Sequence, residues 1–537
     1  MSSQTPIATL GPELRIRLKE HTEGLPNDII NTNLQARFVK EFDGLREFRD
    51  AIGLLTRLGS AIAEEDVKDM LSPGLPFFIA KSSGTSGKAA KLFPKYHHLV
   101  GAAPSRNPFA AKTCHITFMT YLRVIDVLRN EGKSTKVIVT VSSSGMVRMQ
   151  HDLGIEKDPE MIKMTLPNTT SPIAVGHIRN YRSFLLMHAL FALAEEKLTF
   201  VYATYSTIFI DMIMFMEEEW FTLLNSIENG TIPDFEDMSH VHAYLGPKLL
   251  PNPSRAQKLR EIVLQQVNCI LTGVFATTVP QMRYYLGPQV LINSRAVGAS
   301  EGYIRVSYSF TDLNLFKLAT KEFIEYLDIT KNASPANLVP AWELETGRRY
   351  EVFLTTRDGL WRYRLEDIIE VAGFDPVEDM PLLRYVERLN RDLRLSAGVS
   401  ITETQIIAGI LAGEKSLGKV KEFTVIIDER ASLRQFGYFV ELQDALRPNA
   451  HLALHEVHDE LRRINYDVNL HFSNKAIGET TIRILKPGSF SDYRQWRLDI
   501  ARTAAGQTKV PVFVTDEVTK EWLKERVIHE LLHPAED

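Results

Sequence analysis

The chain has 537 residues, of which 44% are hydrophobic and 24% are charged, proportions that are ordinary for a large globular protein. Its net charge of -5 argues against a general nucleic-acid-binding protein, which is usually basic. The two cysteines, Cys114 and Cys269, cannot form a disulfide framework, and their spacing is not that of metal ligands. The N-terminus lacks a signal-peptide pattern, and the apolar runs are shorter than a membrane span. We therefore expect a cytoplasmic monomer that binds neither nucleic acid nor membrane.

A loop rich in serine and glycine follows the apolar residues 77–80, which predict a buried strand. The loop consists of Ser82, Ser83, Gly84, Thr85, Ser86 and Gly87, and Lys88 and Lys91 follow it. Small residues let successive backbone N–H groups point into one concavity, and the lysines add positive charge, so the loop suits a polyphosphate. It is not a Walker A loop, because Ser82 and Ala89 stand where that motif needs glycine and Ser or Thr. A flexible surface loop is the alternative.

The first half of the chain alternates between predicted helices and strands. Helices are expected within residues 11–70, in a segment carrying Phe118, Leu122, Ile125 and Leu128, and across 182–229 up to a stop at Gly230. Strands are expected at 136–141, 269–275, 291–297 and 323–329. The third of these leads into a second small-residue turn, Ala299-Ser300-Glu301-Gly302, which carries one carboxylate. The methionines of 182–229 are expected to be core residues.

Residues 350–374 combine a strand, a turn and an alternating segment. The strand is predicted at 350–355, and Arg357-Asp358-Gly359 predicts a turn. In Leu360–Arg364, the aromatic residues Trp361 and Tyr363 share one face, and Arg362 and Arg364 share the other. Glu366 and Asp367 follow. An ordinary hairpin with an exposed acidic pair is the alternative interpretation.

After Pro381 an arginine-rich segment, residues 384–396, predicts a connector into a smaller α/β unit. Helices are expected near 402–413, 451–464, 491–503 and 515–532, and strands near 421–428, 436–442 and 479–486. The domain boundaries that we expect are 1–388 for a large N-terminal domain, 389–400 for a hinge and 401–537 for the C-terminal domain.

Three stretches together resemble the motifs of the plant auxin-responsive acyl-acid amido synthetase family. Ser82 to Gly87 resembles its SSGTSG phosphate motif, and Ala299 to Gly302 resembles the end of its second motif, Y-x-x-S-E. Thr355-Thr356 through Arg362-Tyr363-Arg364 to Asp367 resembles its third, T-T-x-x-G-L-Y-R-Y-R-x-G-D. Gln507-x-Lys509-x-Pro511 also fits, and all the matches stand in family order.

The resemblance implies an α/β fold with a large adenylate-forming domain of mixed sheets and flanking helices, and a smaller, mobile C-terminal domain. It implies ATP and Mg²⁺ as cofactors. The implied ATP-binding residues are Ser82, Ser83, Gly84, Thr85 and Ser86 at the β- and γ-phosphates, Ser300 at the α-phosphate, and Asp367 and Arg388 at the ribose. Glu301 is the implied Mg²⁺ ligand, and Lys509 is expected to reach the α-phosphate as charge develops.

The implied reaction adenylates a small carboxylic acid and transfers the acyl group to the amine of an amino acid. Two alternatives remain open: transfer to a thiol such as coenzyme A, and a homologue that binds nucleotide or acyl acid without turnover. The sequence departs from the family pattern at three positions. Val297 replaces an aromatic residue, Glu366 replaces the glycine before the ribose-binding aspartate, and Ser400 stands where relatives often have lysine.

Overall fold

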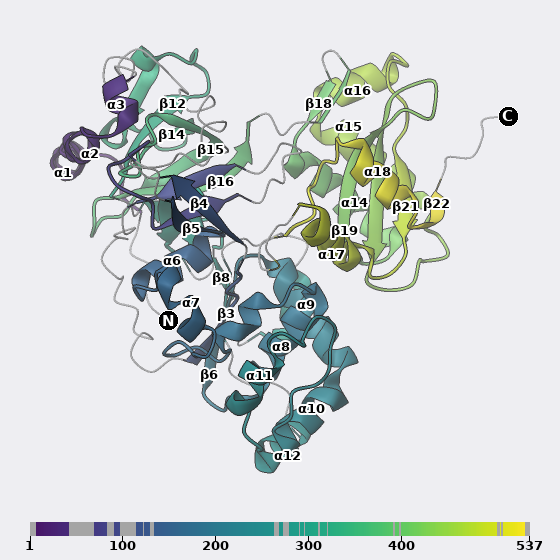
Figure 1. The fold of residues 1–537 in the computed structure, drawn as a ribbon. Coiled ribbons are helices and arrows are strands. Elements are labelled where there is room, and N and C mark those ends of the chain that lie inside the picture. The colour runs from purple at the N-terminus through teal and green to yellow at the C-terminus, as the bar shows by residue number, and fades with distance from the viewer. Residues whose placement is uncertain are drawn as a thin grey trace.

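The chain folds into several sheets with flanking helices, as a computed structural model shows (Figure 1). The structure describes residues 7–41, 69–82, 91–96, 114–121, 123–128, 134–261, 268–271, 279–288, 290, 292–294, 296–309, 312–318, 321–389, 393–396, 399–501, 505 and 508–531. The mixed α/β fold expected from the sequence is confirmed.

The first sheet has the strand order β2-β1-β5-β4. Its strands are β1 (Phe78–Lys81), β2 (Leu92–Lys95), β4 (Arg123–Leu128) and β5 (Ser134–Thr140). The strands predicted at 77–80 and 136–141 are therefore confirmed. The helix predicted around Ile125 and Leu128 is wrong, because both residues lie on β4, paired antiparallel with β5. The β-branched residues Val124, Ile125 and Val127 favour that extended pairing.

A parallel sheet and a layer of helices form the second part of the large N-terminal region (Figure 1). The sheet contains β3 (Cys114–Thr117), β6 (Leu198–Ala203), β7 (Asn268–Leu271) and β8 (Ile292–Ser294). The helices include α7 (Asp158–Met161), α8 (Tyr181–Ala194), α9 (Ser206–Glu218), α10 (Trp220–Asn229), α11 (His242–Leu245), α12 (Pro253–Glu261) and α13 (Val279–Leu286), whereas α6 (Ser142–Gln150) packs against β1 of the first sheet. As predicted, α10 ends at Gly230 with φ 68°, and the methionines Met187, Met212 and Met216 are core residues.

An eight-stranded antiparallel sheet has the order β13-β12-β14-β15-β16-β11-β10-β9. Its strands are β9 (Ala296–Gly298), β10 (Tyr303–Ser307), β11 (Phe316–Leu318), β12 (Phe323–Asp328), β13 (Leu338–Pro340), β14 (Arg349–Thr355), β15 (Tyr363–Phe374) and β16 (Pro381–Arg388). The helices α1 (Pro12–Thr22) and α2 (Leu25–Asn33) share a hydrophobic core with this sheet, and α3 (Arg37–Glu41) follows them. The arginine-rich segment predicted as a connector therefore begins as strand β16, which pairs with β15 along its length.

The C-terminal elements form a separate four-stranded sheet with its own core (Figure 1). Its strands are β19 (Val420–Asp428), β20 (Gln435–Leu442), β21 (Thr481–Leu485) and β22 (Val527–Leu531). The helices are α14 (Glu403–Leu417), α15 (Leu452–Ile464), α16 (Tyr466–Ser473), α17 (Ser489–Ala501) and α18 (Glu517–Lys524). The short pair β17 (Leu393–Ser396) and β18 (Val399–Ile401) packs into the same core. The last predicted helix is wrong beyond α18, where the chain returns as strand β22.

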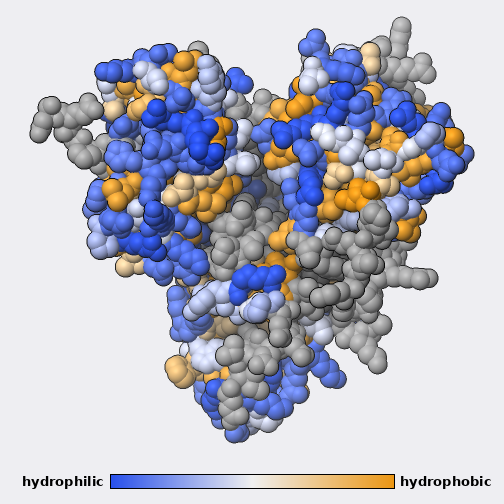
Figure 2. Space-filling view, turned by 180° about the vertical axis from the view of Figure 1, so that it is seen from behind, coloured by the Kyte–Doolittle hydropathy of each residue, from blue (hydrophilic) through white to orange (hydrophobic). Residues whose placement is uncertain are grey.

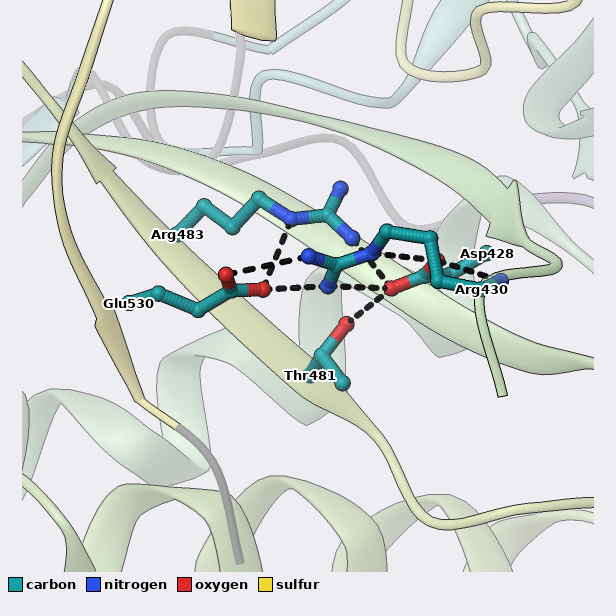
Figure 3. Close-up of polar contacts among 5 residues, drawn as sticks. All are labelled: Asp428, Arg430, Thr481, Arg483 and Glu530. Carbon is teal, nitrogen blue, oxygen red and sulfur yellow. Dashed lines mark hydrogen bonds and ion pairs between the residues drawn. The ribbon is translucent and has the colours of Figure 1, made fainter.

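Four charged side chains and one threonine join three strands of this C-terminal sheet (Figure 3). Arg430 donates to Asp428 Oδ1 at 2.9 Å and to Glu530 Oε2 at 3.0 Å. Arg483 donates to Glu530 Oε1 at 3.0 Å and also pairs with Asp428, which accepts a bond from Thr481 Oγ1 at 3.0 Å. Because Asp428 and Arg483 are buried, this network fixes the register of β19, β21 and β22 at one end of the sheet.

A buried arginine joins the C-terminal unit to the helical layer of the N-terminal region. Arg494 on α17 contacts Asp211 Oδ2 of α9 at 3.1 Å and Glu422 Oε1 of β19 at 2.7 Å. Asp211 also accepts a hydrogen bond from the Tyr181 hydroxyl at 2.9 Å. Seen from behind, the two upper lobes are separated by a notch, and their described surfaces are largely hydrophilic (Figure 2). The two units thus meet through the charged groups around Arg494, and Leu498 and Ala505 of the C-terminal unit pack against the helical core.

Candidate functional site

The three stretches singled out in the sequence meet through one chain of hydrogen bonds. Ser82 Oγ accepts from the backbone N–H of Lys91 at 2.7 Å. Lys91 Nζ donates to the hydroxyl of Tyr363 at 2.8 Å, and that hydroxyl donates to Glu301 Oε1 at 3.2 Å. The edge of the Ser/Gly loop, the turn before β10 and the start of β15 are therefore adjacent in space. Ser83, Gly84, Thr85 and Ser86 lie outside the described residues.

Tyr363 is the centre of this chain, and its phenol remains protonated. Burial raises the pKa of Tyr363, and the negative charge of Glu301 raises it further. The neutral hydroxyl can therefore donate to the carboxylate while it accepts from Lys91. Phe93 packs against the Tyr363 ring edge-on, with ring centres 5.8 Å apart, which limits the movement of the ring.

The two arginines that flank Tyr363 hold the strand in place. Arg362 donates to both carboxylate oxygens of Glu325, at 2.7 and 2.8 Å. Arg364 pairs in the same two-pronged way with Glu351, which is buried. Such bidentate pairs fix geometry as well as adding energy. The arginines of the third motif are thus structural supports that turn Tyr363 toward Glu301.

A buried lysine that the sequence analysis missed holds the turn that carries Glu301. Lys95 on β2 is 2% exposed, donates to the backbone carbonyl of Glu301 at 2.6 Å, and lies 3.4 Å from Asp358. Asp358, in the predicted turn, also accepts the backbone N–H of Tyr96 at 2.8 Å. The one indication in the sequence that Lys95 is buried is its position at the end of the apolar stretch Leu92–Lys95. Lys95 therefore joins the first motif to the second and third.

Asp367 and Arg388 lie opposite each other on β15 and β16 and form an ion pair. Arg388 Nε donates to Asp367 Oδ1 at 2.6 Å. Burial lowers the pKa of Arg388, but the charge of Asp367, and further off that of Glu301, raises it by more. Asp367 is 8% exposed, so the alternative of an exposed acidic pair is wrong for this residue. The structure thus brings together two residues expected at the ribose, with the Glu301 charge nearby.

Glu366 has a backbone conformation that glycine adopts more readily. Its φ is +64°, and its carbonyl accepts the backbone N–H of Leu389 at 2.6 Å. A non-glycine side chain at such a φ carries a steric penalty. The glycine that the family motif has at this position is therefore explained by the backbone, which turns here to present Asp367 to Arg388.

Lys509 lies at the boundary between the C-terminal unit and the helical layer. The segment 508–514 runs beside β19, where Val512 and Val514 exchange backbone hydrogen bonds with Val425 at 2.8 and 2.9 Å. The ammonium of Lys509 lies 5.4 Å from the centre of the Tyr205 ring, just before α9. Lys509 is not part of the hydrogen-bond chain of Lys91, Tyr363 and Glu301.

The donor set around Glu301 fits a hard divalent cation that is held mainly by other oxygens. In the described residues, no three His, Cys, Asp or Glu side chains gather as a metal site. Glu301 and the hydroxyl of Ser300 beside it provide oxygen donors, and the described side chain bonded to the Glu301 carboxylate is a neutral phenol. Mg²⁺ is commonly bound by one or two carboxylates together with substrate phosphates.

None of the helices in the described ranges is long and apolar enough to cross a bilayer.

The fold as a whole is that of an acyl acid amido synthetase. A solved structure described as "GH3.15 acyl acid amido synthetase" matches with a TM-score of 0.78 and 19% identity, over 97% of this chain and 95% of that one. A second, described as the same protein "in complex with 2,4-DB", matches with a TM-score of 0.75 and 19% identity, over 98% of this chain and 95% of that one.

Family models give the more specific assignment. Residues 60–290 match the GH3 family N-terminal domain, 315–388 its central domain and 407–518 its C-terminal domain. The chain belongs to the GH3 family, which is the family that the sequence motifs resembled.

The relatives found by sequence are plant amido synthetases. "Putative indole-3-acetic acid-amido synthetase GH3.9" of Arabidopsis thaliana is 25% identical, over 54% of each chain. "Indole-3-acetic acid-amido synthetase GH3.15" of the same plant is 24% identical over 62% of this chain and 61% of its own. "Jasmonoyl--L-amino acid synthetase GH3.5" of Oryza sativa subsp. japonica is 24% identical over 72% of this chain and 70% of its own. The chain thus matches between about half and two thirds of the first two relatives.

Proposed function

We propose that this protein is an ATP-dependent acyl-acid amido synthetase. The observation that carries the proposal is the convergence of the three family motifs at Lys91, Tyr363 and Glu301, beside the Asp367–Arg388 pair. Membership of the GH3 family and the amido synthetases among its relatives support the same activity. The substrates are ATP, a small carboxylic acid and an amino acid.

The proposed reaction has two steps. A carboxylate oxygen of the acid forms a bond to the α-phosphorus of ATP, and the bond to pyrophosphate breaks. The amine nitrogen of the amino acid then bonds to the acyl carbon, AMP leaves with the bonding electrons, and the nitrogen loses a proton. Both steps build charge at phosphate and carbonyl oxygens, so the protein accelerates them mainly by fixed donors and cations.

Each residue is assigned a role according to the part of ATP that it contacts. Asp367 accepts the two ribose hydroxyls, and Arg388 holds its carboxylate. Ser82, Ser83, Gly84, Thr85 and Ser86 bind the β- and γ-phosphates, and Ser300 binds the α-phosphate. Glu301 holds Mg²⁺, which would neutralise phosphate charge when bound. Lys509 stabilises charge at the α-phosphate, which requires the C-terminal unit to bring it there.

We further propose that the C-terminal unit moves about a pivot at the start of the 389–400 segment, between domains 1–388 and 401–537. Leu393, Leu395 and Val399 are core residues of the C-terminal unit, which supports a pivot before residue 393. We also propose that the enzyme acts as a cytoplasmic monomer without a nucleic-acid or membrane partner, in keeping with its charge of -5.

A two-part assay tests the function. ATP–pyrophosphate exchange is measured with a panel of aryl and alkyl carboxylic acids, for the parent and for Asp367→Ala. We expect exchange with at least one acid in the parent and a strong loss in the variant. Exchange that is absent with every acid, while ATP still binds, would favour the homologue without turnover. Product analysis with amino acids and coenzyme A in competition then identifies the acceptor, and a thioester as the product would contradict amide formation.

A further inference from the structure

Asp367 is one of the residues that line a small cavity in the eight-stranded sheet. Its lining is mostly apolar, and three polar side chains face it, those of Arg305, Tyr326 and Asp367. The cavity has a volume of about 10 Å³, which is room for about one water molecule. The cavity is therefore too small to admit any part of a nucleotide.

Arg305 is an unusual group to find there. It is 3% exposed, and its Nε has no hydrogen-bond partner among the described residues. Its guanidinium lies 4.9 Å from the ring centre of Phe316 on β11 and 5.7 Å from that of Tyr385 on β16. Aromatic faces give a buried cation part of the stabilisation that it loses with water, but burying a charge remains unfavourable without an opposite charge.

Asp367 provides that opposite charge. Burial lowers the pKa of Arg305, and Asp367 is the strongest influence that raises it again, ahead of Tyr385 and Tyr326. The carboxylate is thus bonded to Arg388 at Oδ1, and Arg305 faces the same small cavity as Asp367. Arg388 by itself forms an ion pair with Asp367. The charge of Arg305 therefore has a further effect on this carboxylate.

We propose that Arg305 is a positioning residue that fixes and orients the Asp367 carboxylate, so that it is ready to accept the two ribose hydroxyls of the nucleotide. This inference rests on the proposed function, because it assigns Asp367 to the ribose. Arg305 acts through Asp367 and does not itself touch the ligand. Its contribution therefore depends on the hydroxyls: it strengthens binding of a ribonucleotide and leaves binding of a sugar without hydroxyls unchanged.

Calorimetry with ATP and with 2′,3′-dideoxy-ATP tests this dependence. We expect the parent to prefer ATP, and Arg305→Met to weaken ATP binding about ten-fold, which lies within the range of coupling energies between interacting residues, with dideoxy-ATP binding unchanged. Arg305→Lys keeps the charge and should recover most of the preference. Arg348→Met is the matched control, because Arg348 is an exposed arginine paired with Asp328 in the same sheet, and it should leave both affinities unchanged.

The other outcomes are equally decisive. Equal weakening of both nucleotides, or an unchanged preference in Arg305→Met, would overturn the inference and leave the proposed function standing. A parent that binds ATP and dideoxy-ATP equally would overturn the inference together with the assignment of Asp367 to the ribose, whereas the proposed function would still be decided by pyrophosphate exchange. In the Asp367→Asn background, Arg305→Met should have no further effect on ATP binding, and an added effect of the same size would show that Arg305 acts independently of Asp367. If a thermal melt shows that Arg305→Met does not fold, Arg305→Gln is subject to the same comparison.

Discussion

Glu366 stands at a backbone angle that explains the glycine of the family pattern and leaves the glutamate of this chain strained. Its left-handed φ is compatible with glycine and strained for glutamate. We expect Glu366→Gly to raise the free energy of unfolding by about 0.5 to 1 kcal/mol, which is the steric penalty less the greater freedom of glycine in the unfolded chain. Urea denaturation of the parent and the variant measures the difference.

Glu366→Ala separates backbone strain from charge. Alanine removes the carboxylate and keeps the side-chain clash, so its stability should not exceed that of the parent. An equal gain from glycine and from alanine would assign the effect to the negative charge beside Asp367 and would contradict the account from φ.

Lys509 is the second residue whose role can be tested alone. If it stabilises charge that develops at the α-phosphate, Lys509→Ala should slow pyrophosphate exchange about a hundred- to a thousand-fold with little change in ATP affinity. Lys524→Ala is the control, because Lys524 is a surface lysine of the same unit, paired with Glu521 on α18. A parent rate in Lys509→Ala, or a parallel fall in ATP affinity, would contradict a role confined to the transition state.

At the scale of elements, the sequence predicts best where periodicity and end signals agree. Strands β12, β14 and β19 and helices α14 and α15 lie close to their predicted ranges. The segment that became β4 was misread because apolar residues three and four apart also occur in strands, and only pairing with β5 decides between the two. For the same reason β22 was read as the end of a helix, although it completes the sheet beside β21.

The candidate site was predicted as a set of stretches, without the contacts that join them. Nothing in local sequence indicates that Lys91 meets Tyr363, or that Lys95 meets the carbonyl of Glu301, because these residues are far apart in the chain. Arg305 could not be recognised either, since its proposed role depends on its burial and on the cavity that it shares with Asp367. Family resemblance supplied what periodicity could not, namely which stretches belong together.

The network at the end of the C-terminal sheet predicts a dependence of stability on pH (Figure 3). Burial by itself would raise the pKa of Asp428, but hydrogen bonds from Arg430 and Thr481 and the charge of Arg483 lower it from 3.8 to about 2. Because the folded-state value is the lower one, this stabilisation is present above about pH 4 and is lost as the pH falls toward 2. It should amount to on the order of 2 kcal/mol.

Unfolding free energies of the parent and of Asp428→Asn, measured from pH 7 down to pH 3, test this prediction. The difference in unfolding free energy between the parent and Asp428→Asn should be constant near neutral pH and should become smaller below about pH 4. A difference that is independent of pH would mean that Asp428 contributes packing and hydrogen bonds, without the linkage that its charge implies.

At the scale of the whole molecule, the contact between the two units depends on Arg494. This residue is fully buried and serves both Asp211 and Glu422, so Arg494→Ala leaves two carboxylates without their cation. We expect a loss of about 3 to 5 kcal/mol in the stability of the docked arrangement, as for other broken buried ion pairs. Small-angle scattering should then show a larger radius of gyration in the variant.

Arg463→Ala is the matched control for this experiment, since Arg463 is an exposed arginine of the same unit that pairs with Glu460. It should leave the radius of gyration unchanged. A compact Arg494→Ala protein with parent-like scattering would show that the remaining contacts, among them the bond from Tyr181 N–H to Gln495 at 2.6 Å, are sufficient to dock the units.

The ionic character of this contact has a consequence for repeated motion. An interface made of apolar side chains would expose an apolar surface whenever it separated. If the C-terminal unit moves in each turnover, as proposed, the protein would then risk self-association each time. At the Arg494 contact, the groups uncovered by separation are charges, which water solvates readily, and the apolar residues that the described C-terminal unit adds to the helical core are Leu498 and Ala505. When the contact forms, the free energy lost by removing these charges from water offsets much of their mutual attraction. Neither the open nor the closed arrangement is therefore greatly favoured. If the units move as proposed, this contact can separate and form again without exposing a large apolar surface, and because Arg494 is fully buried its ion pairs in the closed state are screened by salt much less than surface pairs.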